Sequence, residues 1–341
     1  MTLREKVCKM IWVRPEALDP ALSWQNNDDL VAIGRTEITD AMRARAEEYP
    51  VGGVILFAHN MTGPEQLQRL VADVKALPGA PLLCIDEEGG RVARIANNPA
   101  FGLPKYESMT ALANEGAGAV RKAAGTIGKY LHGYGFDIDF APVADVNTNP
   151  ANIVIGPRAF SDSPRTAGRM VQTYLKSLQA QGVTGCIKHF PGHGDTSADT
   201  HFGYAVSHKT WEELLECEMV PFRSGIAAGA RMVMTAHVSL PEVTGSEIPS
   251  TLSYTVLTEK LRGELGFDGV IVTDAMEMGA ITRQYSSVEA CLLAVEAGAD
   301  VLLCVKNYPA AVDAIEQAVI DGRIPESRID ESVRRILELR Q

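Results

Sequence analysis

Short apolar runs recur along the whole chain, and longer segments with helically spaced apolar residues separate them. The short runs are rich in β-forming residues and predict eight strands, near Met10–Val13, Gly53–Phe57, Leu82–Ile85, Ile138–Pro142, Gly185–His189, Met232–Ala236, Val270–Thr273 and Val301–Val305. The longer segments predict helices over Ala41–Glu48, Glu65–Ala76, Thr110–Leu131, Ser163–Gln181, Trp211–Ala228, Leu257–Leu265, Ser287–Ala297, Ala310–Asp321 and Glu326–Leu339.

Strands that alternate with helices in this way are typical of a single (β/α)8 barrel of the TIM type, and 341 residues suit that fold. No linker, low-complexity tract or repeat divides the sequence, so we expect one catalytic domain over residues 1–341 without a second α/β domain. A doubly wound open sheet is the alternative. The absence of a G-x-G-x-x-G after the first strand and of a Walker A motif argues against its nucleotide-binding versions.

Composition excludes several classes of function. The formal net charge of −11 argues against nucleic-acid binding. No apolar run approaches the roughly 20 residues that span a bilayer. The N-terminal segment is charged from Arg4 and its apolar part is too short for a signal peptide, so we expect a cytoplasmic protein without a membrane partner. The six cysteines form no C-x-x-C pair, which argues against a structural zinc or a redox dithiol.

The densest chemistry lies in Lys188–His201, directly after an apolar strand-like run. This segment holds three histidines, one lysine and two aspartates, and Pro and Gly interrupt it. Packing alone does not select such groups, because they are costly to bury without partners. A strand that ends in a polar loop is where enzymes built on α/β scaffolds keep their catalytic residues.

Polar residues also follow the other predicted strands. In a barrel all strands point their carboxyl ends at one face, so these side chains are expected to converge. They are Asp86, Glu87, Glu88, Arg91 and Arg94 after the third strand, Asp145, Asn147 and Arg158 after the fourth, His237 after the sixth and Asp274 after the seventh.

Asp274 suits a nucleophile, a general base or a metal ligand, and the alternative is a helix N-cap. Asp199 and His201 are two residues apart, so both can reach one point. A carboxylate beside an imidazole raises the pKa of the imidazole and fixes its tautomer, which favours proton transfer. The alternative for this pair is an Asx-turn beside a solvated histidine.

Cationic groups at the strand ends suit sugar hydroxyls, carbonyls or phosphates. Arg94, Arg158 and Lys188 are of this kind, although Arg158 has a surface ion pair with Asp162 as its alternative. Asp86 suits two hydrogen bonds from a vicinal diol, or a cap on the Gly89–Gly90 turn that follows it.

Glu87 and Glu88 are expected to be structural partners of nearby arginines. His189, His193, Asp199 and His201 allow a zinc site in principle, but their spacing matches no motif such as H-E-x-x-H. We therefore expect neither a metal nor a cofactor.

Taken together, these segments resemble glycoside hydrolase family 3, in particular its NagZ-type β-N-acetylglucosaminidase subgroup. The matches run in order from about Val51 to Val305. The segments that carry the resemblance are Lys188–Gly194 with Asp199–His201, Asp86–Arg94 as D-x-E-G-G-x-V-x-R, Phe140–Asn147 with Ile155–Phe160, and Val272–Met278.

The resemblance implies a (β/α)8 barrel and a retaining double displacement without a metal. It implies Asp274 as the nucleophile and His201 as the general acid/base, with Asp199 as its partner, on a loop that Gly192 and Gly194 allow to move. N-acetylglucosamine would be held by Asp86, Arg94, Arg158, Lys188 and His189. The expected substrate is a carbohydrate, an N-acetylglucosaminide from peptidoglycan fragments; the sequence predicts no oligomeric state.

Other functions remain open on the same residues. A β-glucosidase or an N-acetylglucosaminide phosphorylase fits the same scaffold, a catalytically silent sugar-binding protein is a second alternative, and a metal-dependent barrel hydrolase is a third. The chain also departs from the family pattern. Thr200 replaces a common Ser, and Asn152-Ile153-Val154 interrupts the usual Asn-Pro-Val, so we expect the loop of Arg158 to sit slightly differently.

Overall fold

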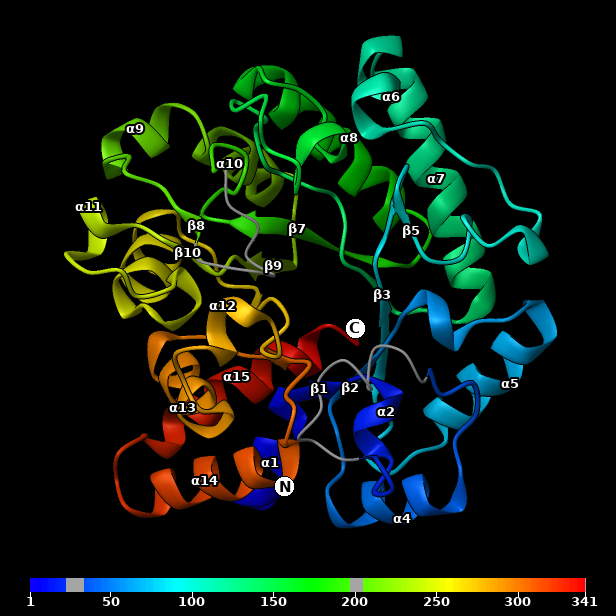
Figure 1. Cartoon of the computed structure of the whole chain (residues 1–341), viewed down its shortest axis with the longest axis vertical. Helices are drawn as coiled ribbons and strands as arrows, with labels where there is room; N and C mark the ends of the chain where they lie inside the picture. The colour runs from blue at the N-terminus through cyan, green and yellow to red at the C-terminus, as the bar shows by residue number, and fades with distance from the viewer. Residues whose placement is uncertain (23–33, 197–204, 341) are drawn as a thin grey trace.

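A ring of eight parallel strands forms the centre of the molecule (Figure 1). The computed structural model describes residues 1–22, 34–196 and 205–340. The strands are β1 (Ile11–Val13), β2 (Gly53–Leu56), β3 (Leu82–Ile85), β6 (Ile138–Asp139), β7 (Thr184–Phe190), β9 (Met232–Thr235), β11 (Val270–Val272) and β12 (Leu302–Leu303). Their order in the sheet is β11-β9-β7-β6-β3-β2-β1-β12.

The two ends of this sheet meet, which closes the barrel. Val272 forms a parallel bridge with Val301, and the backbone N–H of Thr273 donates to the carbonyl of Val301 at 2.9 Å. The expected (β/α)8 barrel is therefore confirmed, and each of the eight predicted strands overlaps one strand of the ring.

Helices surround the ring on its outer side, as Figure 1 shows. They are α1 (Leu3–Met10), α2 (Pro15–Leu18), α4 (Asp40–Glu48), α5 (Pro64–Lys75), α6 (Met109–Glu115), α7 (Ala117–Tyr134), α8 (Pro164–Gln179), α9 (Trp211–Glu216), α10 (Met219–Ala227), α11 (Pro241–Thr244), α12 (Gly279–Thr282), α13 (Ser287–Ala297), α14 (Tyr308–Ile320), α15 (Glu326–Glu338) and a π-helix (Thr255–Glu264).

Shorter elements lie between them. In the described part of the chain, 3-10 turns cover Ala58–Asn60, Pro99–Phe101, Gly156–Arg158 and Ser250–Leu252. The antiparallel hairpin β4–β5 joins Glu87–Gly89 to Val92–Ala93, and the parallel pair β8–β10 joins Ala205–Val206 to Val238–Ser239. The hairpin follows β3 directly, so it fixes the residues just beyond that strand.

The four-residue helices α2, α11 and α12 were not predicted, and three longer helical segments also differ from the prediction. Helix α1 was not expected, and it takes Met10 from the predicted first strand. The predicted helix Thr110–Leu131 is two helices, because Gly116 ends α6 with a φ of 105° that other residues rarely adopt. The predicted helix Trp211–Ala228 is also two helices, and the non-helical backbone of Cys217 ends the first of them.

Apolar side chains from the strands and the inner faces of the helices form one continuous core. A second, small cluster of Val143, Ile155 and Ala159 lies beside it. This cluster anchors the loop that carries Arg158, because Ile155 and Ala159 flank that residue in the chain. None of the described helices is long and apolar enough to cross a membrane.

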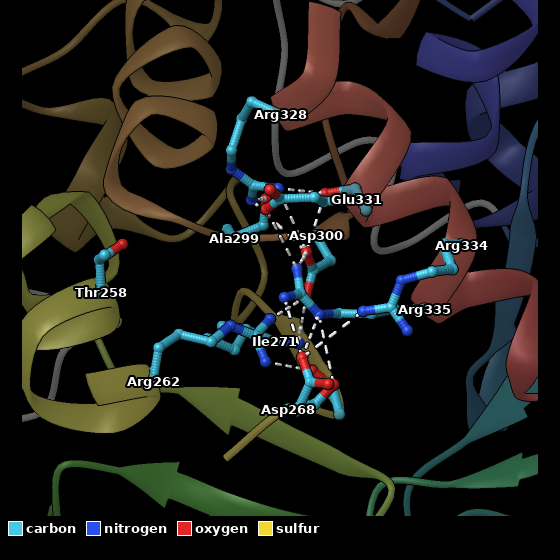
Figure 2. A network of polar contacts seen from close by, with 12 residues as sticks. Thr258, Arg262, Asp268, Ile271, Ala299, Asp300, Arg328, Glu331, Arg334 and Arg335 are labelled. Atoms are coloured by element: carbon cyan, nitrogen blue, oxygen red, sulfur yellow. Dashed lines mark hydrogen bonds and ion pairs between the residues drawn. The ribbon is translucent and has the colours of Figure 1, made fainter. Parts of the chain in front are cut away.

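A buried ion network closes the barrel at the amino ends of β11 and β12 (Figure 2). Asp300 is fully buried, and it accepts hydrogen bonds from Ser332 Oγ at 2.8 Å and from the backbone N–H of Ile271 at 2.9 Å. Three arginines, from the π-helix and α15, also pair with Asp300: Arg262, Arg328 and Arg335. The network therefore fastens α15 and the π-helix to the base of the barrel.

Candidate active site

A cavity of about 940 Å³ opens at the carboxyl ends of the strands, at the upper end of the range for small-molecule sites. Six of the eight residues predicted to catalyse the reaction or bind the sugar line it: Asp86, Arg94, Arg158, Lys188, His189 and Asp274. The other two, Asp199 and His201, lie outside the described residues. The structure thus brings together side chains from β3, β7, β11 and the loop after β6.

Lys188 lies at the centre of the charge network in this cavity. It belongs to β7, and its side chain is almost fully buried. Its Nζ lies 2.7 Å from Asp86 Oδ1 and 2.6 Å from Glu88 Oε1. Burial tends to lower the pKa of Lys188, but the two carboxylates outweigh it and hold the pKa above its ordinary value. Lys188 is therefore a permanent cation.

Arg158 forms a two-point ion pair with Glu88. Its Nε lies 2.9 Å from Glu88 Oε2 and its Nη2 lies 2.7 Å from Glu88 Oε1, which is the geometry of a strong charge-assisted pair. Burial tends to raise the pKa of Glu88, but Arg158 and Lys188 hold it far below its ordinary value. The surface pair with Asp162, which was the alternative for Arg158, gives way to this buried pair.

His189 is oriented by Asp145. Its Nδ1 lies 2.7 Å from Asp145 Oδ2, and its Nε2 lies 3.3 Å from Arg158 Nη2. Because Arg158 can only donate, Nε2 accepts in this arrangement and the proton on Nδ1 points to Asp145. The backbone N–H of His193 donates to the second oxygen of Asp145 at 2.6 Å, so this carboxylate also fixes the start of the loop after β7.

Asp274 directly follows Thr273, at the carboxyl end of β11. Burial tends to raise its pKa, but the imidazoles of His237 and His189, the backbone N–H of Ala275 and the ammonium of Lys188 outweigh it, so the pKa lies below its ordinary value. The N–H of Ala275 donates to Asp274 Oδ1 at 2.7 Å. Asp274 is therefore a buried carboxylate that stays ionised at neutral pH.

Asp86 and Arg94 form the side of the cavity opposite Asp274. Arg94 Nη2 lies 3.3 Å from Asp86 Oδ2, whose partner oxygen binds Lys188. Burial tends to raise the pKa of Asp86, and Lys188 and Arg94 lower it below its ordinary value. The alternative for Asp86 was a cap on the turn that follows it. In the structure its carboxylate contacts Lys188 and Arg94 instead.

The sequence placed Glu88 and Asp145 among the converging side chains but assigned neither of them a role in catalysis or sugar binding. Glu88 does pair with an arginine, as expected, but it also joins Lys188 to Arg158 at the cavity wall. The expectation for Glu87 was wrong: it accepts the backbone N–H groups of Ile95 and Ala96 at 2.9 Å. One signal was available, since residues two apart at a strand end face the same side, as Asp86 and Glu88 do.

The Asn152-Ile153-Val154 segment has a structural role, which Asn152 and Val154 carry. Asn152 donates to the carbonyl of His193 at 2.7 Å, and its side-chain oxygen accepts the backbone N–H of Ile155 at 2.8 Å. The carbonyl of Val154 accepts from Arg158 Nη1 at 3.1 Å. Asn152 therefore ties the loop of Arg158 to the segment after β7.

A metal site was the other interpretation of the histidine-rich segment. Within residues 1–22, 34–196 and 205–340, no group of three or more His, Cys, Asp or Glu side chains is arranged to hold a metal ion. Two of the four candidate ligands, Asp199 and His201, lie outside these ranges.

Comparison with known proteins places the barrel in a family. Residues 2–339 match the family model described as the glycosyl hydrolase family 3 N terminal domain. Beta-hexosaminidase of Thiobacillus denitrificans is 36% identical over 291 residues, which cover 84% of this chain and 80% of that protein. Beta-hexosaminidase A of Pseudoalteromonas piscicida is 33% identical over 319 residues, which cover 86% of this chain but 53% of that protein.

A solved structure is similar over the whole chain. The glycoside hydrolase family 3 beta-N-acetylglucosaminidase from Paenibacillus sp. str. FPU-7 superimposes with a TM-score of 0.90 at 38% sequence identity, and the match covers 100% of this chain and 62% of that one. The chain thus spans about half to two thirds of the length of some relatives and most of the length of others. The family model matches residues 2–339, almost the entire length of this chain, so the chain belongs to glycosyl hydrolase family 3.

Proposed function

We propose that this protein is a retaining exo-β-N-acetylglucosaminidase that removes terminal N-acetylglucosamine. The observation that carries the proposal is Asp274, an ionised carboxylate at the end of β11 that lines the same cavity as Lys188 and His189. The beta-hexosaminidase and beta-N-acetylglucosaminidase names of the relatives support the substrate class. The barrel of residues 1–341 would act as one catalytic domain.

In the first step the Asp274 carboxylate attacks the anomeric carbon. A bond forms between Asp274 and the anomeric carbon, the bond to the leaving oxygen breaks, and His201 gives its proton to that oxygen. In the second step His201 takes a proton from water, and the water oxygen displaces Asp274 from the sugar. Asp199 would hold the tautomer of His201. Most retaining glycosidases use a second carboxylate here, so the His–Asp pair is an exception to that pattern.

The sugar-binding groups follow from the charges around the cavity. Lys188 and Arg158 each keep a permanent positive charge, so they donate hydrogen bonds to hydroxyl oxygens, and the Asp86 carboxylate accepts from a hydroxyl. His189 and Arg94 complete the set that would hold N-acetylglucosamine. Because these groups already bind one another, a sugar enters a network that is fixed before it arrives, which reduces the cost of binding.

The natural substrate is proposed more narrowly as a peptidoglycan fragment that ends in N-acetylglucosamine. The cytoplasmic location expected from the charged N-terminal segment stays a prediction beside it, and cell fractionation with an antibody tests it. A periplasmic or extracellular signal would contradict the location and leave the chemistry unchanged.

The experiment that tests the proposal compares 4-nitrophenyl N-acetyl-β-glucosaminide with the matching glucoside, with and without inorganic phosphate. We expect kcat/KM to favour the N-acetylglucosaminide by at least about two orders of magnitude, or about 2.7 kcal/mol. Equal hydrolysis of the glucoside would favour a β-glucosidase. A sugar 1-phosphate as the product would favour a phosphorylase. Activity that EDTA abolishes and zinc restores would overturn the mechanism.

A further inference from the structure

Four strand ends divide the mouth of the barrel into quarters. Asp274 follows β11, Lys188 and His189 lie in β7, and Asp86 follows β3. In the closed ring β3 is four strands from β11 by either route, so Asp274 and Asp86 face each other across the cavity. β7 and β1 each lie two strands from β11, on opposite sides. The quarter at β1, which begins with Arg14, has no role in the proposed function.

The quarter at β1 contains a buried ion pair. Arg14 Nη2 lies 2.5 Å from Glu277 Oε1, and the two side chains are 7% and 15% exposed. The guanidinium of Arg14 lies over the ring of Phe57, with 4.4 Å between its Cζ and the ring centroid. Arg14, Phe57 and Glu277 all line the cavity.

The Arg14–Glu277 pair is costly to keep. Nε and Nη1 of Arg14 are buried and have no hydrogen-bond partner in the part of the chain that the structure describes. Burial raises the pKa of Glu277 above its ordinary value, and the charges of Arg14 and Lys306 oppose this rise without cancelling it. A buried, incompletely satisfied ion pair is weak evidence for stability, because its desolvation can exceed its attraction. Its position at the cavity wall supplies another reason to keep it.

The chemistry of Glu277 determines what it can bind. An ionised carboxylate only accepts hydrogen bonds, so its partner must be a hydroxyl or an amide N–H. Consider a pyranose whose anomeric carbon lies at Asp274 and whose opposite end lies at Asp86. One of its two long edges then faces Lys188 and His189. The other long edge then faces Glu277 and the ring of Phe57. On N-acetylglucosamine the donors on the two edges are the acetamido N–H, the ring hydroxyls and the hydroxymethyl group.

We propose that Glu277 determines specificity by accepting a hydrogen bond from the edge of the terminal sugar that faces β1, and that Arg14 is its positioning residue. The inference rests on the proposed function and deepens it. It adds a fourth wall to the site, opposite the Lys188–His189 wall. Glu277 lies three residues after Asp274, so one short loop carries both the proposed nucleophile and the group that holds the sugar beside it.

The experiment measures kcat/KM for three aryl β-glycosides: the N-acetylglucosaminide, its 6-deoxy analogue and the glucoside, which lacks the acetamido group. Each is tested with the wild type, Glu277→Ala, Glu277→Gln and Arg14→Met. The matched control is Glu296→Gln with Arg323→Met, which breaks an ion pair of 2.6 Å on the surface. Circular dichroism verifies that each variant is folded, and Glu277→Gln, which keeps the side-chain volume, serves if Glu277→Ala does not fold.

We expect Glu277→Ala to lower kcat/KM for the N-acetylglucosaminide by about ten- to a hundredfold, the range for a hydrogen bond to a charged group. For one of the two analogues, the ratio of kcat/KM for the N-acetylglucosaminide to that for the analogue should fall toward 1. The variant no longer contacts the group that this analogue lacks. A loss of preference over the 6-deoxy compound assigns the hydroxymethyl group, and a loss over the glucoside assigns the acetamido N–H. The control should keep both preferences.

Arg14→Met should shift the same preference by a smaller factor, mainly through KM, and Arg14→Lys should restore part of it. A purely structural role would lower the folded fraction and leave the preference unchanged. Folded Glu277 variants with both preferences as in the wild type would overturn the inference and leave the proposed function standing. A wild-type protein inactive on all three glycosides would overturn the proposed function first.

Discussion

The barrel carries a buried ion network at each end. The two networks differ in whether protein groups occupy all the hydrogen-bonding positions of their carboxylates. At the base, both oxygens of Asp300 are fully used by protein donors, three of them arginines. At the mouth, Asp86 and Glu88 share Lys188, and the cations around them border a cavity of about 940 Å³. Similar ion pairs therefore serve as an internal fastening at one end and as a surface for a ligand at the other.

The comparison teaches how to tell a structural from a functional charge network. Buried ion pairs add little net stability unless every partner is satisfied. At the base the partners come from α15, the π-helix and β11, so the network specifies how those elements dock. At the mouth the partners lie at strand ends, where residues are held rigidly and side chains remain open to one side. Loss of the base carboxylate should reduce stability and leave activity unchanged, whereas the proposed nucleophile at the mouth should affect activity and leave stability unchanged.

The largest expected effect belongs to the mouth. Asp274→Asn should lower kcat by about four orders of magnitude or more, a barrier of about 5.5 kcal/mol, because a neutral amide is a poor nucleophile. The change is nearly isosteric, so the melting temperature should move little. Steady-state kinetics and thermal unfolding of the same preparation give both values. Near-normal turnover would remove Asp274 from the nucleophile role.

The base should show the opposite response. Asp300→Ala leaves three half-buried arginines without their carboxylate, so we expect the free energy of unfolding to fall by about 3–5 kcal/mol. The kcat per folded molecule should stay within about twofold, because the network lies at the other end of the strands. Urea unfolding and active-site titration measure the two quantities, with Glu296→Gln as a surface control expected to cost about 0–1 kcal/mol. A large drop in kcat with unchanged stability would invalidate the comparison.

The smallest effect depends on pH. The pKa of Glu88 in the folded protein lies far below its ordinary value of 4.5, so its stabilising contribution is complete above about that pH and is lost as the pH falls through the folded-state pKa. Glu88→Gln should therefore cost about 1–3 kcal/mol at pH 7 and progressively less below pH 4.5. Urea unfolding of both proteins across this range measures it. A cost that does not change with pH would mean that Glu88 is not ionised in the folded state.

Much of the fold could be predicted because the barrel repeats one pattern. Each strand is a short apolar run between polar or glycine-containing turns, and all eight were found. Helix α1 was missed, although Thr2 and Glu5 form a capping box that the sequence displays as T-x-x-E. The break at Gly116 was missed because the apolar spacing of α6 and α7 continues across it, so periodicity alone does not reveal the stop.

The sequence could predict which residues lie in the site, but it could not predict which of them form ion pairs with one another. Residues after strand ends converge in any barrel, which brought Asp86, Lys188 and Asp274 to one cavity. The pairing of Glu88 with Arg158 joins positions 70 residues apart, and no local pattern contains it. The same holds for Arg14 and Glu277, which meet because β1 and β11 both neighbour β12 in the closed ring.

The closing of the ring by β12 also sets when the protein can become active during its synthesis. β12 pairs with β1, the first strand made, and bridges to β11 through Val301. A nascent chain that has not yet released β12 from the ribosome holds seven strands with two unpaired edges. Contacts between such distant segments form slowly, and open edges attract other chains. Until β12 has emerged, the barrel is therefore open, and its cavity lacks the wall to which Leu303 of β12 contributes.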